Sequence, residues 1–236
     1  MEKALLLDLG LTPFAEAWEL QKRIWQLRVE ARIPDTLILV EHPAVITLGK
    51  SGKAGNLLVS EDELKARGIE LFRIERGGDI TWHGPGQLVG YPLFFIPAAI
   101  AGVRAFVTRV EESLIRALAA SGIQAGRKPG LTGVWVSEEK VAALGIAVRK
   151  RVSFHGFALN VNPDMTGFQL INPCGIRDKG VTSLARLLNR PVSMPVAKHQ
   201  VVSAFEKVFD REFVLTSRER ILNPCPECYA TQNPEL

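Results

Sequence analysis

The chain has 236 residues, of which 47% are hydrophobic and 23% are charged. These proportions are ordinary for a globular protein, and a chain of this length can bury a substantial core without disulfide or metal staples. The net charge of +4, from 29 basic and 25 acidic residues, is too small to favour a nucleic-acid partner. It is compatible with an acidic protein partner.

Nothing in the sequence indicates export or membrane insertion. The leucine run at 5–7 is interrupted by Asp8, so it is too short for the core of a signal peptide. No apolar stretch approaches the roughly 20 residues that cross a bilayer. The three cysteines, an odd number, argue against a disulfide framework. We therefore expect a cytoplasmic protein with free thiols and no membrane partner.

Short alternating or β-branched runs predict strands, and apolar residues at three- and four-residue spacing predict helices. In chain order, strands are expected at 4–8, 36–41, 44–48, 71–75, 88–95, 133–136, 141–148 and 153–161. Helices are expected at 14–31, 60–67, 104–121, 181–188 and 197–209. Their irregular alternation predicts a mixed α+β (α/β) fold rather than a doubly wound sheet. Residues 1–222 are expected to form a single domain, and the proline-containing residues 223–236 a flexible tail.

A glycine-rich stretch at 76–87, RGGDITWHGPGQ, is the most informative part of the chain. Gly77 and Gly78 lack Cβ atoms, so they permit positive φ and a close approach of ligand to backbone. Between the strands at 71–75 and 88–95, the stretch is expected to form the broad loop of a hairpin that walls a cleft. It has neither the GxGxxG spacing of a dinucleotide turn nor the Gly-Lys-Ser/Thr of a phosphate loop. A hairpin whose His83 only caps a neighbouring carbonyl explains the stretch equally well.

A lysine and a cysteine further along give this stretch a chemical context. Cys174 lies between Pro173 and Gly175, which places its thiol in a turn rather than on an apolar face. A reactive thiolate needs a nearby cation or helix N-terminus, because the ordinary thiol pKa is about 8.5. Lys140 opens an apolar run whose small residues would leave room for a ligand chain. The simpler alternatives are a buried cysteine, a solvated lysine and, at His155, a hydrogen-bonded core histidine.

The order and composition of four sequence blocks resemble the lipoyl(octanoyl) transferase family. The blocks are RGGxxTxHGPGQL at 76–88 with YPL at 91–93, KVAALG at 140–145, HGFALN at 155–160, and PCG at 173–175 with TSL at 182–184. The resemblance extends from about residue 41 to residue 188. It implies the single α/β catalytic domain that this family shares with biotin- and lipoate-protein ligases.

The resemblance also implies roles for individual residues. Cys174 would be the nucleophile that forms an acyl-thioester, and Lys140 would lower the pKa of this thiol and is a candidate general base. Three segments would line the acyl-substrate site, with His155 as a further wall residue. These segments contain Arg76, Gly77, Gly78, Asp79, Ile80, Thr81, Trp82, His83, Ala143, Leu144, Gly145, Gly156, Phe157 and Ala158. The small side chains among them, together with Ala142, are expected to form the slot for the acyl chain.

The implied reaction moves an octanoyl group from octanoyl-acyl carrier protein, through Cys174, to a lysine of a lipoyl domain. Such domains occur in the E2 subunits of 2-oxoacid dehydrogenases and in the glycine cleavage H protein. Thioester exchange is nearly balanced energetically, so neither ATP nor a metal is expected. The basic residues Arg149, Lys150 and Arg151 are a candidate docking surface for the acidic carrier.

Three other functions compete with this interpretation. An ATP-dependent lipoate- or biotin-protein ligase shares the fold but needs no cysteine nucleophile. A non-catalytic module that binds carrier protein or acyl chains would keep the pocket without turnover. A cysteine hydrolase would need a Cys-His-acid set that the sequence does not clearly supply. The pair Cys225 and Cys228 provides half of a tetrahedral zinc site and is expected to be a disordered or surface pair of thiols, with a redox pair as the alternative.

Overall fold

The computed structural model describes residues 1–97, 102–172 and 179–225. The described residues form a main sheet of nine strands and a small sheet of three. Eight strands of the main sheet follow one another in the order β12 (Arg211–Leu215), β1 (Glu2–Leu11), β2 (Thr36–Glu41), β6 (Gln87–Leu93), β10 (Val152–Asn160), β9 (Glu139–Arg149), β8 (Leu131–Val136) and β7 (Gly126–Lys128). The ninth strand, β11 (Gly180–Val181), pairs in parallel with the beginning of β9.

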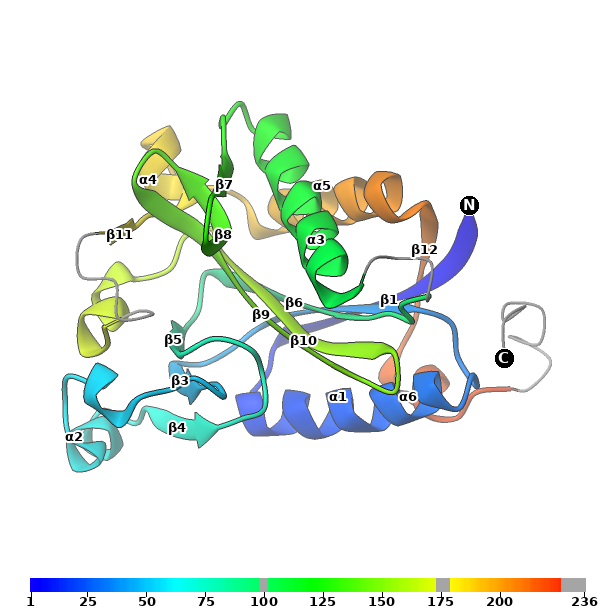
Figure 1. Ribbon diagram of the computed structural model, residues 1–236, viewed down its shortest axis with the longest axis horizontal. Helices are drawn as coiled ribbons and strands as arrows, with labels where there is room; N and C mark the ends of the chain where they lie inside the picture. The colour runs from blue at the N-terminus through cyan, green and yellow to red at the C-terminus, as the bar shows by residue number, and fades with distance from the viewer. Residues whose placement is uncertain (98–101, 173–178, 226–236) are drawn as a thin grey trace.

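Helices cover both faces of the main sheet (Figure 1). One face carries α1 (Phe14–Val29) and α6 (Arg218–Leu222), and the other carries α3 (Gly102–Ala120) and α5 (Met194–Phe209). The short helix α4 (Leu184–Leu188) begins after Ser183, whose side chain accepts the Arg186 N–H at its N-terminus.

The alternation of side chains along β2 shows how the sheet separates two cores. Leu37 and Leu39 join the core formed with α3 and α5, whereas Ile38 and Val40 join the core formed with α1. A strand that is covered on both faces is expected to be apolar throughout, and the sequence Leu-Ile-Leu-Val of β2 fits this expectation.

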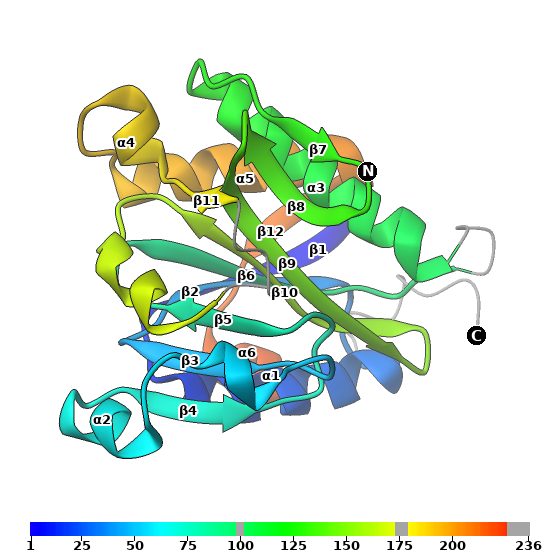
Figure 2. The ribbon, with the colours of Figure 1, turned by 60° about the vertical axis from the view of Figure 1, so that its left-hand side comes forward.

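The small sheet lies beside the main one and consists of β4 (Glu70–Arg73), β3 (Val45–Leu48) and β5 (Ile80–His83) (Figure 2). The helix α2 (Glu61–Ala66) and the 3₁₀ segments η1 (Ala54–Asn56) and η2 (Met165–Leu170) accompany it. Its apolar residues form a separate core that includes Ile46, Leu64, Trp82 and Leu170. The chain therefore returns to this sheet after β10, because η2 packs on β5.

The fold class and most of the expected elements are confirmed, but the hairpin expected around 76–87 is wrong. The segment at 71–75 contributes to β4 of the small sheet, whereas the one at 88–95 contributes to β6 of the main sheet. The intervening loop is therefore a crossing between sheets, and its end forms β5. Period-two alternation identifies strands but does not say which sheet a strand joins.

Other differences concern the ends of elements. The helix expected at 181–188 begins only at Leu184, because Val181 pairs with Lys140 as part of β11. The helix expected at 197–209 begins at Met194, and the edge strands β7 and β12 were not expected. The expectation of a flexible tail at 223–236 lies largely outside the described residues.

A buried carboxylate joins three distant parts of the main sheet. Asp35 accepts hydrogen bonds from Arg28 Nε and the Phe95 N–H, each at 2.8 Å, and from Arg211 at 3.4 Å. The Asp35 and Arg28 side chains are 5% and 8% exposed. Because water cannot replace the partners of such a group, removing its charge leaves buried donors unsatisfied.

We predict that Asp35→Asn lowers the free energy of unfolding by about 3 kcal/mol, the cost of breaking a buried ion pair. Urea unfolding measures this change. Asp62→Asn is the matched control, because the Asp62–Lys65 pair is exposed and its loss should leave the midpoint unchanged. Equal midpoints for Asp35→Asn and the unsubstituted protein would contradict the structural role of Asp35.

Candidate active site

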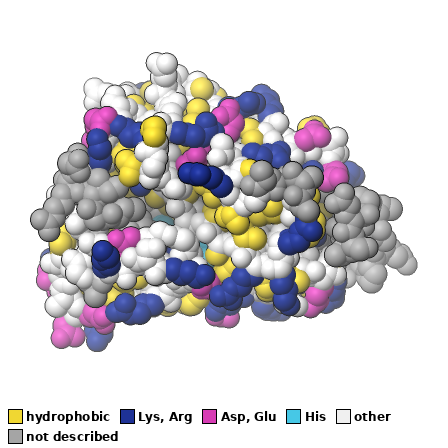
Figure 3. Space-filling view, in the orientation of Figure 1, with side chains coloured by type: hydrophobic (Ala, Val, Ile, Leu, Met, Phe, Trp, Pro, Cys, Tyr) yellow, Lys and Arg dark blue, Asp and Glu magenta, His cyan; other side chains and the backbone are white. Residues whose placement is uncertain are grey.

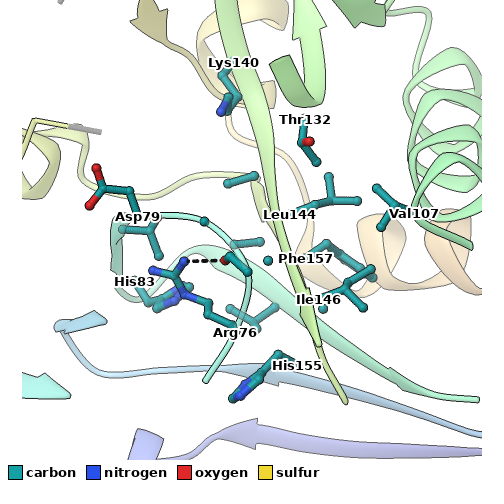
Figure 4. Close-up of a pocket in the computed structure, with 18 of the residues that line it drawn as sticks. Arg76, Asp79, His83, Val107, Thr132, Lys140, Leu144, Ile146, His155 and Phe157 are labelled. Atoms are coloured by element: carbon teal, nitrogen blue, oxygen red, sulfur yellow. Dashed lines mark hydrogen bonds between the residues drawn. The ribbon is translucent and has the colours of Figure 1, made fainter. Parts of the chain in front are cut away.

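A cavity of about 740 Å³ opens between the two sheets and extends around strand β9. Figure 4 shows Arg76, Asp79 and His83 on one side of β9, and Thr132 and Val107 on the other. The volume lies in the range that holds drug-sized ligands. Fourteen of the residues expected at the site line this cavity: Arg76, Gly77, Gly78, Asp79, Ile80, Thr81, His83, Lys140, Ala143, Leu144, Gly145, Gly156, Phe157 and Ala158. His155 lines it as well.

Arg76 forms one wall and is almost entirely buried, with 8% of its surface exposed. Its Nη2 donates to the Thr47 carbonyl at 2.7 Å and its Nη1 donates to the Gly77 carbonyl at 3.0 Å. These bonds hold the guanidinium against β3, while Gly78 adopts a φ of +86°, which glycine reaches without strain. The loop can therefore turn immediately after a buried arginine.

The same loop touches the edge of β9. The Gly77 N–H donates to the Ile146 carbonyl at 3.4 Å. A Cβ atom on Gly145 would lie 2.8 Å from both Arg76 Cδ and the Gly77 carbonyl oxygen. Only a glycine at 145 permits this approach, which explains one member of the small-residue run in the sequence.

Asp79 anchors backbone rather than standing free in the cavity. Its carboxylate accepts the Lys53 N–H at 3.1 Å and a hydrogen bond from the side-chain amide of Asn56. The Asn56 carbonyl in turn accepts the Asn172 N–H at 2.7 Å. Asn172 is the last described residue before Pro173 and Cys174, which lie outside the described residues. Asp79 therefore helps to fix the point from which the cysteine segment departs.

A chain of buried hydrogen bonds connects the sequence blocks of the site. His83 Nδ1 donates to Gln87 Oε1 at 2.6 Å, because both amide hydrogens of Gln87 are used by other acceptors. Gln87 Nε2 donates to Asn160 Oδ1 at 2.9 Å, and Asn160 Nδ2 donates to the Thr182 carbonyl at 2.9 Å. The Thr182 N–H then donates to the Lys140 carbonyl at 3.0 Å. The chain fixes His83 with its Nε2 unprotonated.

A second buried histidine supports the wall near Tyr91. His42 Nδ1 donates to the Thr12 carbonyl at 2.7 Å, and the Tyr91 hydroxyl lies 2.8 Å from His42 Nε2. Burial lowers the pKa of His42 to about 4 and that of His83 to about 3. Burial raises the pKa of Tyr91. All three groups are therefore uncharged at neutral pH.

His155 occupies a strained position in the middle of β10. Its φ is +57°, in the left-handed region that non-glycine residues seldom adopt. Its N–H leaves the sheet and donates to Gln21 Oε1 at 2.5 Å. Its side chain is 2% exposed, and Nε2 lies 3.6 Å from Glu75 Oε2, too far for a hydrogen bond. Burial lowers the pKa of His155. The strained backbone holds the imidazole at the cavity wall.

Lys140 lies where β9, β11 and β8 meet. Its Nζ is 4.8 Å from the centre of the Trp135 ring, a cation–π distance. Its aliphatic stem passes Gly133, where a Cβ atom would approach within 3.2 Å. The side chain therefore reaches the cavity along a fixed path. Cys174, which Lys140 is expected to contact, lies outside the described residues.

Two residues expected at the site belong to the core instead. Trp82 faces away from the cavity and packs on Phe168, with ring centres 5.2 Å apart. Side chains alternate along β5, so Thr81 and His83 share the face opposite Trp82. Both of them reach the cavity. Ala142 is fully buried in the core with α3 and α5. Both expectations for the cavity wall are corrected.

Several polar residues that support the site were given no individual role from the sequence, although Gln87, Tyr91 and Asn160 stand in its resemblance blocks. These residues are all buried and comprise Gln21, Thr47, Gln87, Tyr91 and Asn160. Thr47 holds Arg76 and Gln21 holds the backbone of His155, while Gln87 and Asn160 continue the bonds from His83. Their position in an otherwise apolar strand or helix face is the feature of the sequence that could have identified them as supporting residues.

Within the parts of the chain that the structure describes, no group of three His, Cys, Asp or Glu side chains is placed to hold a metal ion. Across the same residues, none of the helices combines the length and apolar character that a bilayer crossing requires.

Comparisons with known proteins agree with this arrangement. A family model described as the lipoyl protein ligase A/B catalytic domain matches residues 13–206. An octanoyltransferase of Caldicellulosiruptor bescii is 45% identical over 217 residues, which are 91% of this chain and 95% of that protein. An octanoyltransferase of Dictyoglomus thermophilum is 48% identical over 210 residues, 89% of each chain.

Solved structures show the same fold at low sequence identity. A lipoate-protein ligase A bound with ATP superposes with a TM-score of 0.73 at 17% identity, covering 98% of this chain and 97% of the other. A mutant biotin protein ligase from Aquifex aeolicus, in complex with biotin, gives a TM-score of 0.52 at 15% identity, covering 87% of this chain and 70% of the other.

The fold and the cavity thus define a catalytic domain of the lipoyl protein ligase A/B type. Within this class the chain belongs to the octanoyltransferase family, as its long, closely similar relatives show. It is an acyltransferase that acts in protein lipoylation. The resemblance of the sequence blocks is confirmed.

Acid should destabilise the protein through the buried histidines. Unfolded histidine has a pKa near 6.5, whereas His42 and His83 remain neutral in the fold until about pH 4 and pH 3. Below pH 6.5 the unfolded state therefore binds more protons, and stability falls as pH falls. Each histidine should contribute about 2 kcal/mol to the loss between pH 6.5 and pH 5.

Urea unfolding at pH 7 and pH 5 measures this loss, and His42→Gln should reduce it. His199→Gln is the control, because it makes the same substitution at an exposed position and should leave the free energy of unfolding at pH 7 nearly unchanged. An identical pH dependence for His42→Gln and the unsubstituted protein would contradict a neutral, buried His42.

Proposed function

We propose that the protein transfers an octanoyl group from octanoyl-acyl carrier protein to a lysine of lipoyl domains, through a thioester on Cys174. The acceptors would be the E2 subunits of 2-oxoacid dehydrogenases and the glycine cleavage H protein, in the cytoplasm. The observation that carries the proposal is the cavity, whose wall combines small residues of β9 and β10 with Lys140 at one end.

The slot for the acyl chain would lie beside the Arg76–Gly78 loop, against the β9–β10 pair at Ala143 and Ala158, which line the cavity. Gly145 and Gly156 are directly opposite in register, and so are Ala143 and Ala158. The short side chains of Ala143 and Ala158 leave room in the cavity, whereas the space at Gly145 is filled by Arg76 and Gly77 and the space at Gly156 by the Gly90 carbonyl of β6. Each buried methylene of the chain contributes about 0.8 kcal/mol to binding, so an eight-carbon chain can be selected by fit.

The reaction has two thioester-linked steps. The Cys174 thiolate attacks the carbonyl carbon of the donor, a new C–S bond forms, and the thiol of the phosphopantetheine leaves as the old C–S bond breaks. The lysine amine of the lipoyl domain then attacks the enzyme thioester, forms the amide and releases Cys174. Lys140 would lower the pKa of Cys174 and accept the proton of the amine.

The proposal requires no ATP and no metal. A thioester donor is already activated, and the amide product is stable, so transfer to the amine is favourable without nucleotide. His83 adds no charge to the cavity wall, because burial lowers the pKa of its imidazole to about 3, whereas Arg76 contributes one buried cation whose hydrogen bonds go to Thr47 and the Gly77 carbonyl.

Mass spectrometry of the intact protein tests the proposal directly. After mixing with octanoyl-acyl carrier protein and no ATP, we expect an octanoyl adduct on the unsubstituted protein and none on Cys174→Ala. Cys225→Ala is the matched control, because Cys225 is an exposed thiol and its variant should keep the adduct. Adding a lipoyl domain should move the adduct to the acceptor lysine.

A different outcome would identify a ligase. If no adduct forms without ATP, and the acceptor is modified only when ATP and free octanoate are supplied, the acyl-enzyme proposal is wrong. An undiminished transfer rate in Cys174→Ala would also exclude Cys174 as the nucleophile.

A further inference from the structure

The cavity has a second part, on the α3 side of β9, that an octanoyl chain does not need. Its walls are Val103, Arg104 and Val107 of α3 and the segment from Gly130 to Thr132 at the start of β8. Figure 4 places Val107 and Thr132 across β9 from Arg76 and His83. We name these wall residues, together with Leu144, the α3 lobe. An eight-carbon chain is much smaller than the drug-sized ligands that cavities of about 740 Å³ hold.

The α3 lobe exists because β8 turns away from β9. The last pair between these strands is Val134 with Ala142. At the next position Gly133 adopts a φ of +133°, and its N–H donates to Glu111 Oε1 of α3 at 2.9 Å instead of to β9. Gly133 therefore ends the pairing and leaves the following part of β9 without a neighbouring strand among the described residues.

Backbone groups of β9 between Ala142 and Ile146 are consequently left on the open edge of the strand, between the end of β8 and the Arg76–Gly78 loop. The Ile146 carbonyl points away from β10, because it accepts the Gly77 N–H. Peptide groups two residues apart in a strand point the same way, so the N–H and the carbonyl of Leu144 face the same edge. Within the described residues, neither group forms a backbone hydrogen bond on that edge. Leu144 thus offers one donor and one acceptor, as an edge strand does to an extended ligand.

The remaining walls are apolar with one cation at the margin. Val103 is 45% exposed, so an apolar side chain lies open at the entrance of the lobe. Figure 3 shows hydrophobic side chains gathered beside the N-terminal part of α3, with Lys and Arg side chains around them. Arg104 is exposed and has no ion-pair partner among the described residues. The α3 lobe therefore fits an extended ligand with amides in its middle and an anionic group at one end.

We propose that the α3 lobe binds the phosphopantetheine arm of the acyl donor. The arm carries two amides, which would pair with Leu144 on the open edge of β9, and a phosphate, which would meet Arg104. The thirteen bonds from its sulfur to its phosphorus span about 15 Å when extended. With the sulfur near Lys140, this length follows β9 for about four or five residues and ends beside α3. This inference rests on the proposed function and adds the binding site of the donor.

The proposal also explains how a distant basic cluster can serve the same donor. Arg149, Lys150 and Arg151 form the β9–β10 turn, nine residues or about 30 Å along β9 from Lys140. Lys150 and Arg151 have φ values of 47° and 61°, where glycine or asparagine is usual in such a turn. A carrier protein whose arm lies along β9 would have its body at this turn. The extended arm spans about half of the distance between Lys140 and the β9–β10 turn. The surface of the carrier protein would extend over the other half.

The test compares octanoyl-phosphopantetheine with octanoyl-pantetheine, which lacks the phosphate. For the unsubstituted enzyme we expect a KM about tenfold lower with the phosphorylated donor, the effect of one charge-assisted hydrogen bond. Arg104→Gln should remove this difference by raising the KM of the phosphorylated donor only. Arg190→Gln is the control, because Arg190 is exposed and lies outside the cavity wall.

A binding measurement separates this inference from the transferase reaction. Calorimetry with phosphopantetheine that carries no acyl group should give a Kd about tenfold weaker for Arg104→Gln than for the unsubstituted protein, whether or not transfer occurs. Hydrogen exchange should show slower exchange of the Leu144 N–H when phosphopantetheine is bound. Equal Kd values, or an Arg104→Gln variant that raises only the KM of the lipoyl domain, would overturn the proposal.

Discussion

The contact of the Arg76–Gly78 loop with strand β9 is the constraint on which the rest of the site depends. This loop carries the chain from the small sheet back toward the main one, and it touches β9 where Gly145 has no side chain. Arg76 is held on its other side by Thr47 of β3. Two sheets that share no ladder are thereby fixed at a distance that leaves a cavity between them. A side chain at 145 would force them apart and disrupt the slot.

A chain of neutral hydrogen-bonded groups connects the loop to the rest of the site. The bonds from His83 through Gln87 and Asn160 to Thr182 add no charge to the wall, yet they connect the loop to the backbone of Lys140. A network of this kind positions its members only if all are satisfied, because an unpaired buried group costs the full desolvation energy. The reacting end of the substrate and the slot for its chain are therefore parts of one connected unit.

The sequence was sufficient for the fold class, for most strands and helices, and for fourteen residues of the cavity wall. It failed where the outcome depends on which sheet a strand joins. The segment at 76–87 crosses between sheets rather than closing a hairpin, and Trp82 alternates into the small core. Gln21 and Thr47 could not be found either, because their roles depend on contacts with His155 and Arg76 that are distant in sequence.

A crystal structure of the enzyme with octanoyl bound to Cys174, obtained without acceptor, tests the central claim most directly. The account predicts a hydrocarbon chain beside the Arg76–Gly78 loop, against Ala143 and Ala158 of the β9–β10 pair, with its carbonyl beside Lys140. A chain that lies instead on the α3 side of β9, among Val103, Val107 and Leu144, would contradict it. In that case the α3 lobe would bind the acyl chain, and the part of the cavity beside the Arg76–Gly78 loop would bind the phosphopantetheine arm.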